Sequence, residues 1–347
     1  MSRGVFADAG VPTRAASDGG AEPARELAAE APAGASPVLA PALLDIGALA
    51  ALRVQPRETL LGDWFKAGDY GIVSGRRGLG KSWKAMNIAC ALAQGRALGP
   101  WQCDKPRRVL YVDGEMALDD YRARLGLLGG MCENFFTLSH QSVFEQSKAA
   151  LCLSDAAQQN ELTRLCEVNK IDVLFLDNGA CLFRGIAENK ADDFRDFVEN
   201  WFLDLRRRGI AVVLVLHAGR NGEIRGTSKR EDAAFWIMRL DEVAGGGDAD
   251  CGARFMTRFA KNRNAVTDPP PFEWHYETVD GKMRVSHKEA DSQAMFLQWI
   301  RDGLDTCGEI AEEMGLSKGR VSKLATKAMN AGLIKKNGRK YEILPPF

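Results

Sequence analysis

The chain has 347 residues, with 46 Lys and Arg against 46 Asp and Glu, and is 46% hydrophobic. This balance excludes a protein that binds polyanions through its net charge, so any nucleic-acid surface must be a local basic patch. The longest apolar runs, such as 210–216, have the length of strands and are too short to cross a bilayer. With no signal-like N-terminus, we expect a cytoplasmic protein that does not contact membranes. The 8 cysteines contain no C-x-x-C pair, which argues against a zinc site and a disulfide framework.

Composition divides the chain into three predicted parts. Residues 1–45 are rich in Ala, Gly and Pro and poor in aromatic residues, which predicts a disordered tail. A short helix at 45–53 leads into an α/β domain over 46–287. A small helical domain is predicted over 291–347.

The α/β prediction rests on apolar runs that alternate with amphipathic ones, which is typical of a mostly parallel sheet covered on both faces. The last four predicted strands follow one another without helices and indicate an antiparallel edge. Strands are predicted at 71–75, 109–112, 172–176, 211–216, 235–240, 253–260, 272–277 and 282–286. Helices are predicted at 82–94, 118–128, 155–168 and 191–208.

The sequence GRRGLGKS at residues 75–82 fits G-x-x-x-x-G-K-[ST], the phosphate-binding loop of P-loop NTPases. A predicted strand precedes it and a predicted helix follows it, as the motif requires. The backbone N–H groups of the loop would point at phosphate oxygens, and the helix N-terminus adds a partial positive charge. Lys81 is expected to reach the β- and γ-phosphates of ATP, and Ser82 to bind Mg²⁺. The glycines that let the loop curl are Gly75, Gly78 and Gly80.

Two further strands end in carboxylates. The run 173–176 ends at Asp177, where a carboxylate can orient the Mg²⁺ ligands. The run 109–112 is followed by Asp113-Gly114-Glu115, and Glu115 can orient or deprotonate the attacking water. Asp113 is the alternative for that role, or a structural residue of the turn.

The segment VDGEMALD at 112–119 closely resembles the catalytic-glutamate segment of RecA-fold ATPases. The order of phosphate loop, Glu strand, Asp strand and the strand 212–216 is similar to that fold over about 60–286. Residues 223–236 and 259–264 resemble segments of hexameric replicative helicases. The compact size and the Asp-Gly-Glu strand end are most similar to plasmid RepA-type helicases with a DnaB-like core. The chain departs from these families in having no recognisable primase or loader-binding domain and in its C-terminal domain.

The resemblance implies roles for three further residues. His217, after the strand 212–216, would sense the γ-phosphate, unless it only fills space at a strand end. Lys261 and Arg263 would reach the nucleotide of the neighbouring subunit, with Arg263 the stronger candidate. The alternative is a pair of exposed cations on an edge strand.

Two loops, 178–190 and 218–230, resemble the pore loops that track single-stranded DNA. They could instead be solvated surface loops, and one of their cations, Arg225, could position the phosphate or the subunit interface. Their candidate nucleic-acid contacts are Arg184, Lys190, Arg220, Arg225, Lys229 and Arg230.

The C-terminal pattern predicts helices at 293–301, 306–314 and 318–331, then a hairpin at 333–344 with an Asn337-Gly338 turn. This order is that of a winged helix-turn-helix, which commonly binds duplex DNA but can also dock on proteins. Ser317 is the predicted N-cap of the third helix. The residues expected to contact duplex DNA are Lys318, Arg320, Lys323, Lys327, Lys335 and Lys336.

These features together predict an ATP- and Mg²⁺-dependent, ring-forming DNA helicase or translocase, a homo-oligomer and most simply a hexamer, in plasmid or mobile-element replication. The alternative is an ATP-switched DNA-binding regulator or replication initiator without unwinding activity. A recombinase-like filament is a third possibility, which open helical symmetry would reveal.

Overall fold

The computed structural model describes residues 39–185, 198–218, 229–243, 252–266, 269–314 and 316–344. The chain divides into two units, Met1–Pro56 and Arg57–Phe347. The described part of the first unit contains a 3₁₀ turn at Ala40–Ala42 and helix α1 (Ile46–Ala51). The Asp45 side chain caps α1 by accepting a hydrogen bond from the Ala48 amide at 2.7 Å. The helix predicted at 45–53 therefore forms.

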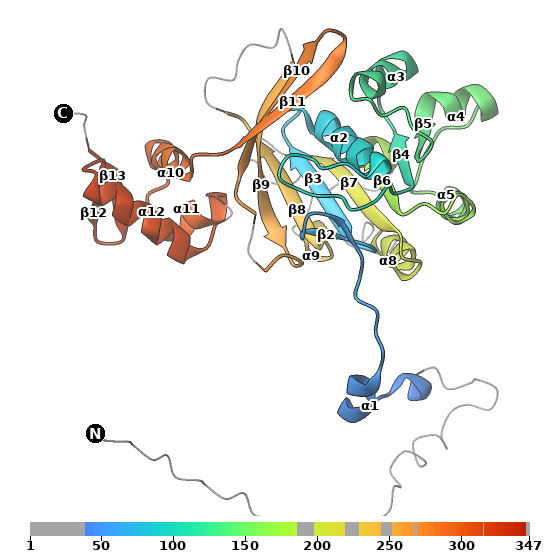
Figure 1. Ribbon diagram of the computed structural model, residues 1–347, viewed down its shortest axis with the longest axis horizontal. Helices are drawn as coiled ribbons and strands as arrows, with labels where there is room; N and C mark the ends of the chain where they lie inside the picture. Colours follow the sequence, from blue (N-terminus) through green and yellow to red (C-terminus); the bar gives the residue numbers. More distant parts are fainter. Residues whose placement is uncertain are drawn as a thin grey trace, which may run out of the picture. The chain divides into compact units, whose positions relative to one another are not determined.

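The second unit is built on a nine-stranded sheet in the order β11-β10-β9-β8-β3-β7-β6-β4-β5 (Figure 1). The six strands from β8 to β5 run parallel to one another, and β9, β10 and β11 are antiparallel. The predicted α/β class with a mostly parallel sheet is confirmed. The strands are β3 (Tyr70–Gly75), β4 (Val109–Asp113), β5 (Phe135–Ser139), β6 (Val173–Asp177), β7 (Ala211–His217), β8 (Trp236–Asp241), β9 (Gly252–Asn262), β10 (Phe272–Val279) and β11 (Lys282–Glu289).

Two details of the sheet differ from the prediction. Strand β8 pairs parallel with β3, so it belongs to the parallel part and not to the antiparallel edge. The connection from β7 to β8, residues 218–235, is long enough for a crossover, which a parallel pairing requires. Strand β5 was not predicted, because it is an edge strand with mostly half-buried residues and lacks a fully apolar run.

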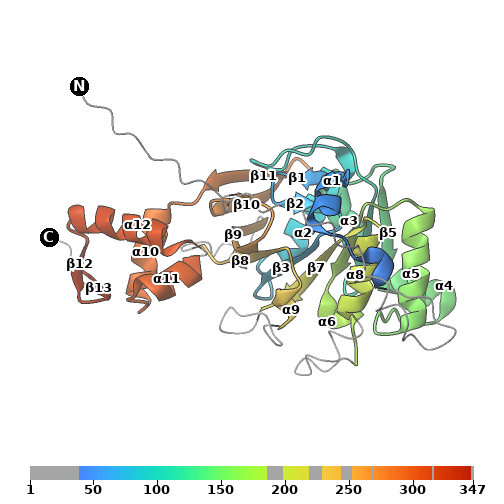
Figure 2. The same ribbon diagram turned by 90° about the horizontal axis from the view of Figure 1, so that it is seen from below.

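Each central strand is buried on both faces because alternate residues enter two separate cores. Val73, Phe175 and Val213 contribute to the core under α2, whereas Ile72, Leu174 and Val212 contribute to the core under α5 and α8. Figure 2 shows the same elements from a second direction.

Of the helix predicted at 191–208, the described part is α8, and residues 191–197 lie outside the described residues. The elements around the sheet are β1 (Thr59–Leu61), β2 (Phe65–Lys66), α2 (Lys81–Gln94), α3 (Leu118–Leu127), α4 (His140–Ser147), α5 (Ala156–Val168), α6 (Gly179–Leu182), α8 (Asn200–Arg207) and α9 (Lys229–Asp232).

The first core contains a lysine among tryptophans. Lys84 of α2 has no exposed surface, and its Nζ lies 2.9 Å from the ring centroid of Trp274 and 4.9 Å from that of Trp101. Within the described residues, this Nζ has no hydrogen-bond partner. Burial lowers the pKa of Lys84 well below 10.5. The two rings are therefore the main compensation for a buried amine.

We expect Lys84→Met to raise the free energy of unfolding at pH 7 by about 1–3 kcal/mol, because a buried amine without a hydrogen-bond partner among the described residues is replaced by an apolar chain of similar length. The pKa of Lys84 is lower in the folded than in the unfolded protein, so the wild type gains stability as pH rises from the folded to the unfolded pKa. The advantage of the variant should consequently shrink as pH approaches 10.5. Denaturant unfolding at several pH values measures this. Lys282→Met, at an exposed site on β11, is the control and should change stability by less than about 0.5 kcal/mol. A less stable Lys84→Met protein would contradict the prediction.

The C-terminal segment has a core of its own. It comprises α10 (Ser292–Arg301), α11 (Cys307–Met314), α12 (Lys318–Asn330), β12 (Ile334–Asn337) and β13 (Lys340–Ile343). Ser317 caps α12 by accepting a hydrogen bond from the Arg320 amide at 3.3 Å, as predicted. The hairpin turn is shifted by one residue, because Asn337 pairs with Lys340 and the two-residue loop is Gly338-Arg339. Gly338 has φ of 63°, which suits a turn with glycine at its first central position. The residues that form the core include Phe296, Ile310, Met314, Val321, Ala325, Ala328 and Tyr341.

None of the helices in the described residues combines the length and apolar character needed to cross a membrane.

Candidate active site

The loop between β3 and α2 requires its glycines for two different reasons. Gly78 and Gly80 have φ values of 79° and 99°, in the left-handed region. A Cβ on Gly80 would also lie 2.8 Å from the ring of Phe255, and one on Gly75 would lie 2.9 Å from the backbone oxygen of Leu240. The curled backbone of a phosphate-binding loop is thus present in the part of the chain where the motif predicts it.

Lys81 opens helix α2 and is 5% exposed. Its Nζ donates a 2.7 Å hydrogen bond to the Arg76 backbone oxygen within the same loop. Burial lowers the pKa of Lys81 to about 8, and the charges of Asp177 and Glu115 partly oppose that shift. A phosphate oxygen in the loop would be a stronger partner for this ammonium than a neutral carbonyl.

Asp177 ends β6 and is held beside the start of α2. The Tyr111 hydroxyl donates a 2.6 Å hydrogen bond to Asp177 Oδ2, and the Ser82 side chain lies near the same carboxyl. Burial raises the pKa of Asp177, and the hydroxyls of Tyr111 and Ser82 oppose the rise. Ser82 and Asp177, predicted separately as Mg²⁺-side residues, are therefore adjacent.

Asp113 ends β4 directly opposite Asp177 in the parallel register. Its Oδ2 accepts the Met116 amide at 3.0 Å, and its buried Oδ1 has no hydrogen-bond partner among the described residues. Burial and the Asp177 charge raise the pKa of Asp113 to about 7. Two buried carboxyls that repel each other beside a hydroxyl form a donor set suited to a hard divalent cation, so these residues fit Mg²⁺.

Glu115 lies just past β4 and, unlike Asp113, has an accessible side chain, 59% exposed. Its Oε2 accepts a hydrogen bond from the Asn178 side-chain amide and lies 4.0 Å from His217 Nε2. The structure thus brings Glu115 and His217 together, because the carboxyl ends of parallel strands meet at one edge of the sheet. Asp113 instead holds the turn that precedes Met116.

Lys261 and Arg263 lie elsewhere. At the phosphate-loop end of the sheet, Gly75 of β3 pairs with Leu240 of β8. At the opposite end, Trp236 of β8 pairs with Asn262 of β9, so Lys261 and Arg263 lie at that opposite end. Lys261 Nζ donates to the backbone oxygen of Asp232 at 2.9 Å, and Arg263 Nη2 donates to the same oxygen at 3.0 Å. In the described part of the chain, neither side chain lies with the Asp177 and Glu115 carboxylates of the phosphate-loop site.

The predicted nucleic-acid residues are described only in part. Arg184 is exposed after α6, and its Nε donates to the Cys181 oxygen at 2.9 Å. Lys190, Arg220 and Arg225 lie outside the described residues, as do the side chains of Lys229 and Arg230. The six C-terminal candidates are all exposed, on α12 and β12: Lys318, Arg320, Lys323, Lys327, Lys335 and Lys336.

Sequence reasoning missed two members of the site. Asn178 could have been found, because it directly follows Asp177 and so lies at the same strand end. Tyr111 precedes Asp113 by two residues in β4 and therefore points to the same face, but a tyrosine in an apolar strand is ordinarily read as core.

Comparison with known proteins agrees with this arrangement. A family model described as an AAA domain matches residues 35–223, more than half of the chain. The chain belongs to the AAA domain family. An AAA domain is an ATPase domain, so the match supports ATP binding and hydrolysis, typically with Mg²⁺. A solved structure similar to the AAA domain protein is the flagellar accessory protein FlaH from Methanocaldococcus jannaschii, with 14% identity, 63% of this chain and 90% of that chain covered, and a TM-score of 0.44. No curated protein matches the sequence.

Proposed function

We propose that this AAA domain protein is an ATP-driven, ring-forming DNA helicase or translocase of the RepA type, acting in plasmid or mobile-element replication. The observation that carries the proposal is the separation of Arg263 from the phosphate loop of its own chain. A finger at the opposite end of the sheet can complete only the site of another subunit, so catalysis requires self-association. A closed ring, most simply a hexamer, provides that arrangement at every site.

The proposed chemistry assigns each residue of the edge a task. Lys81 and the loop amides bind the phosphates, and Ser82 with Asp177 holds Mg²⁺. Glu115 accepts the proton of the attacking water, and His217, close to Glu115, senses the γ-phosphate. Arg263 of a neighbouring copy, assisted by Lys261, stabilises the charge that develops on the γ-phosphoryl group.

Self-association is also supported by the first unit, which exposes a run of large apolar side chains between residues 39 and 54. Leu43 and Ile46 are each 81% exposed. Exposed apolar runs of this kind mark interaction surfaces, and we propose a second copy of this chain as the occupant. Its members are Leu39, Leu43, Leu44, Ile46, Leu49, Leu52 and Val54.

Single-stranded DNA is the proposed track of the motor. Arg184 follows α6, which begins immediately after Asp177 and Asn178. Single-stranded DNA bound at Arg184 would therefore contact a segment that directly follows the hydrolysis site in the sequence. The loop cations Lys190, Arg220, Arg225, Lys229 and Arg230 would add charge to the same path. The deciding experiment measures ATP turnover with and without oligo-dT, beside native mass spectrometry with ATP and Mg²⁺. Turnover that single strands do not raise would reject the motor.

The second candidate, an ATP-switched regulator, is favoured by the basic exposed surface of residues 291–347. We interpret this segment as a winged helix, with α12 as the recognition helix and β12–β13 as the wing, beyond an ATPase domain at 46–287 and a tail at 1–45. Tight duplex binding together with turnover insensitive to single strands would favour the regulator over the motor.

We expect Lys335→Gln/Lys336→Gln in the full chain to weaken duplex binding for all sequences and to reduce the slope of log K against log salt by about 0.9 for each phosphate that the protein no longer neutralises. Fluorescence anisotropy across a salt series measures this. ATP turnover without DNA should not change. Lys282→Gln on β11 is the matched control and should leave the slope unchanged. An unchanged slope in the double variant would argue for a protein-docking role.

A further inference from the structure

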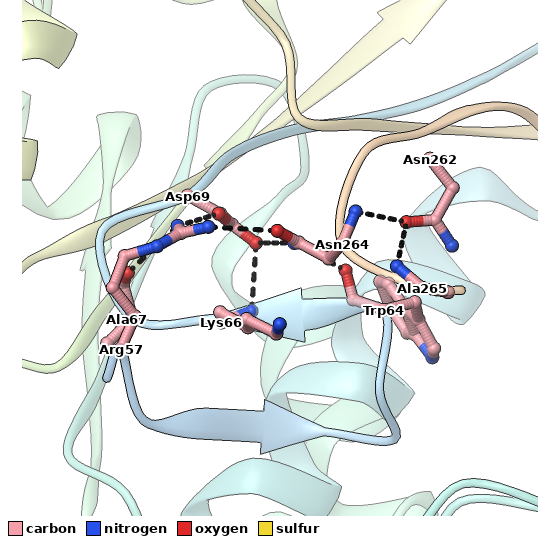
Figure 3. A network of polar contacts seen from close by, with 8 residues as sticks. All are labelled: Arg57, Trp64, Lys66, Ala67, Asp69, Asn262, Asn264 and Ala265. Carbon is pink, nitrogen blue, oxygen red and sulfur yellow. Dashed lines mark hydrogen bonds and ion pairs between the residues drawn. The ribbon is translucent and has the colours of Figure 1, made fainter. Parts of the chain in front are cut away.

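A buried carboxylate lies at the end of the sheet that carries Arg263. Asp69, 1% exposed, immediately precedes β3. Its Oδ1 pairs with Arg57 Nη1 at 2.5 Å, and its Oδ2 accepts the Lys66 amide at 2.8 Å (Figure 3). Oδ2 also accepts the side-chain amide of Asn264 at 2.6 Å, so this carboxyl joins the start of the domain to the segment that follows β9.

Asn264 uses its whole side chain in this network. Besides the bond to Asp69, its Nδ2 donates to the Trp64 oxygen at 2.9 Å, and its Oδ1 accepts Arg57 Nη2 at 2.9 Å. Its backbone amide donates to Asn262 Oδ1 at 3.0 Å (Figure 3). The residue after Arg263 is therefore fixed in position and in orientation.

Among the described residues, Arg263 is held by one backbone hydrogen bond and by one hydrogen bond of its side chain. Its amide donates to the Phe235 oxygen at 2.8 Å, while its exposed side chain makes a single described hydrogen bond, to a backbone oxygen of α9. A side chain that can be released, on a backbone that cannot shift, is what a catalytic group delivered to another subunit needs. Displacing such a group by about 1 Å can lower a rate by about 10²-fold.

We propose that Asp69 is the positioning residue for Arg263, acting through Asn264 and Arg57. The inference rests on the proposed function, because it assumes that Arg263 acts in catalysis. Asp69 precedes β3, at the end of that strand away from the phosphate loop of its own chain, and its task is to hold the strand end from which the finger extends. Burial opposes ionisation of Asp69 and raises its pKa, whereas its three hydrogen-bond donors favour the charged form.

The test is a double-mutant cycle on ATP turnover with Asp69→Asn and Arg263→Ala. The Asn side chain keeps the volume of Asp69 but places an amide against the Asn264 amide or the Arg57 guanidinium. We expect Asp69→Asn to lower kcat by about 10²-fold with little change in ATP binding, and to have no further effect when Arg263 is already Ala. Independent, multiplicative losses in the double variant would overturn the proposal.

A milder variant keeps the test valid if Asp69→Asn folds poorly. Arg57→Gln removes the hydrogen bonds of Arg57 to Asp69 and Asn264, at a side chain that is 35% exposed. We expect this variant to lower kcat about tenfold, and this decrease should disappear when Arg263 is already Ala. Glu58→Gln is the control for lost stability alone. Glu58 is next to Arg57 in the sequence, and the substitution breaks its 2.6 Å ion pair with the buried Arg107 without changing the contacts of Asn264. Its effect should be independent of Arg263.

Subunit mixing separates this inference from the proposed function. Asp69→Asn retains a complete phosphate loop, so mixing it with Lys81→Ala, which retains a positioned finger, should restore turnover. Mixing it with Arg263→Ala should not, because neither partner supplies a positioned finger. Equal recovery in both mixtures would overturn the role of Asp69. If Lys81→Ala and Arg263→Ala themselves show no recovery together, the shared site fails, and the cycle within one protein still decides whether Asp69 acts through Arg263.

Discussion

Glu115→Gln is expected to bind ATP and assemble normally but to hydrolyse ATP about 10²–10⁴ times more slowly, the range typical of lost general-base catalysis. The substitution leaves the phosphate loop, Lys81 and Asp177 intact and removes only the carboxylate that can take a proton from water. The remaining amide can still accept a hydrogen bond from Asn178, whose side chain already binds this position. Rapid-quench turnover measures the rate, and a fluorescent ATP analogue measures binding.

The matched control is Asp113→Asn, at the other carboxyl of the same strand end. Asp113 is buried and accepts the Met116 amide, which an Asn oxygen can also accept, so this substitution should reduce metal affinity more than it affects the proton-transfer step. Lys81→Ala and Asp177→Asn should abolish hydrolysis by weakening nucleotide and Mg²⁺ binding instead. Wild-type turnover in Glu115→Gln would reject Glu115 as the base and turn attention to Asp113.

Arg263→Ala alone and Lys81→Ala alone should each be nearly inactive, the former by about 10³–10⁵-fold, and a mixture of the two should regain part of the wild-type activity. Recovery arises because some interfaces in a mixed assembly pair an intact phosphate loop with an intact finger. The expectation follows from the position of Arg263 at the end of the sheet away from its own loop. Turnover across a series of mixing ratios measures it.

Mixed assemblies must be demonstrated, for example by native mass spectrometry of chains with different tags. Lys282→Ala mixed with Lys81→Ala is the control for dilution, since it carries both an intact loop and an intact finger. No recovery at any ratio in proven mixed assemblies would show that Arg263 does not act between subunits.

The sequence by itself determined the phosphate loop, because eight consecutive residues between an apolar strand and a helix contain all the chemistry of that motif. It also placed Glu115 and Asp177 directly after apolar strand-like runs, at the strand ends where reacting groups gather in a parallel sheet. The Ser317 cap of α12 was predicted locally too, because a serine directly before a helical run is a typical N-cap.

Only the tertiary structure decided features that depend on residues distant in the chain. Strand β8 pairs parallel with β3 because of a crossover whose direction no local pattern encodes. The contact of Asn178 with Glu115 spans 63 residues, and that of Asn264 with Asp69 spans 195. Lys84 is buried against Trp101 and Trp274, although its neighbours along α2 give no sign of those rings. Periodicity reports which face of an element is apolar, whereas the partner of a polar side chain is set by which strands and loops the folded chain brings beside it.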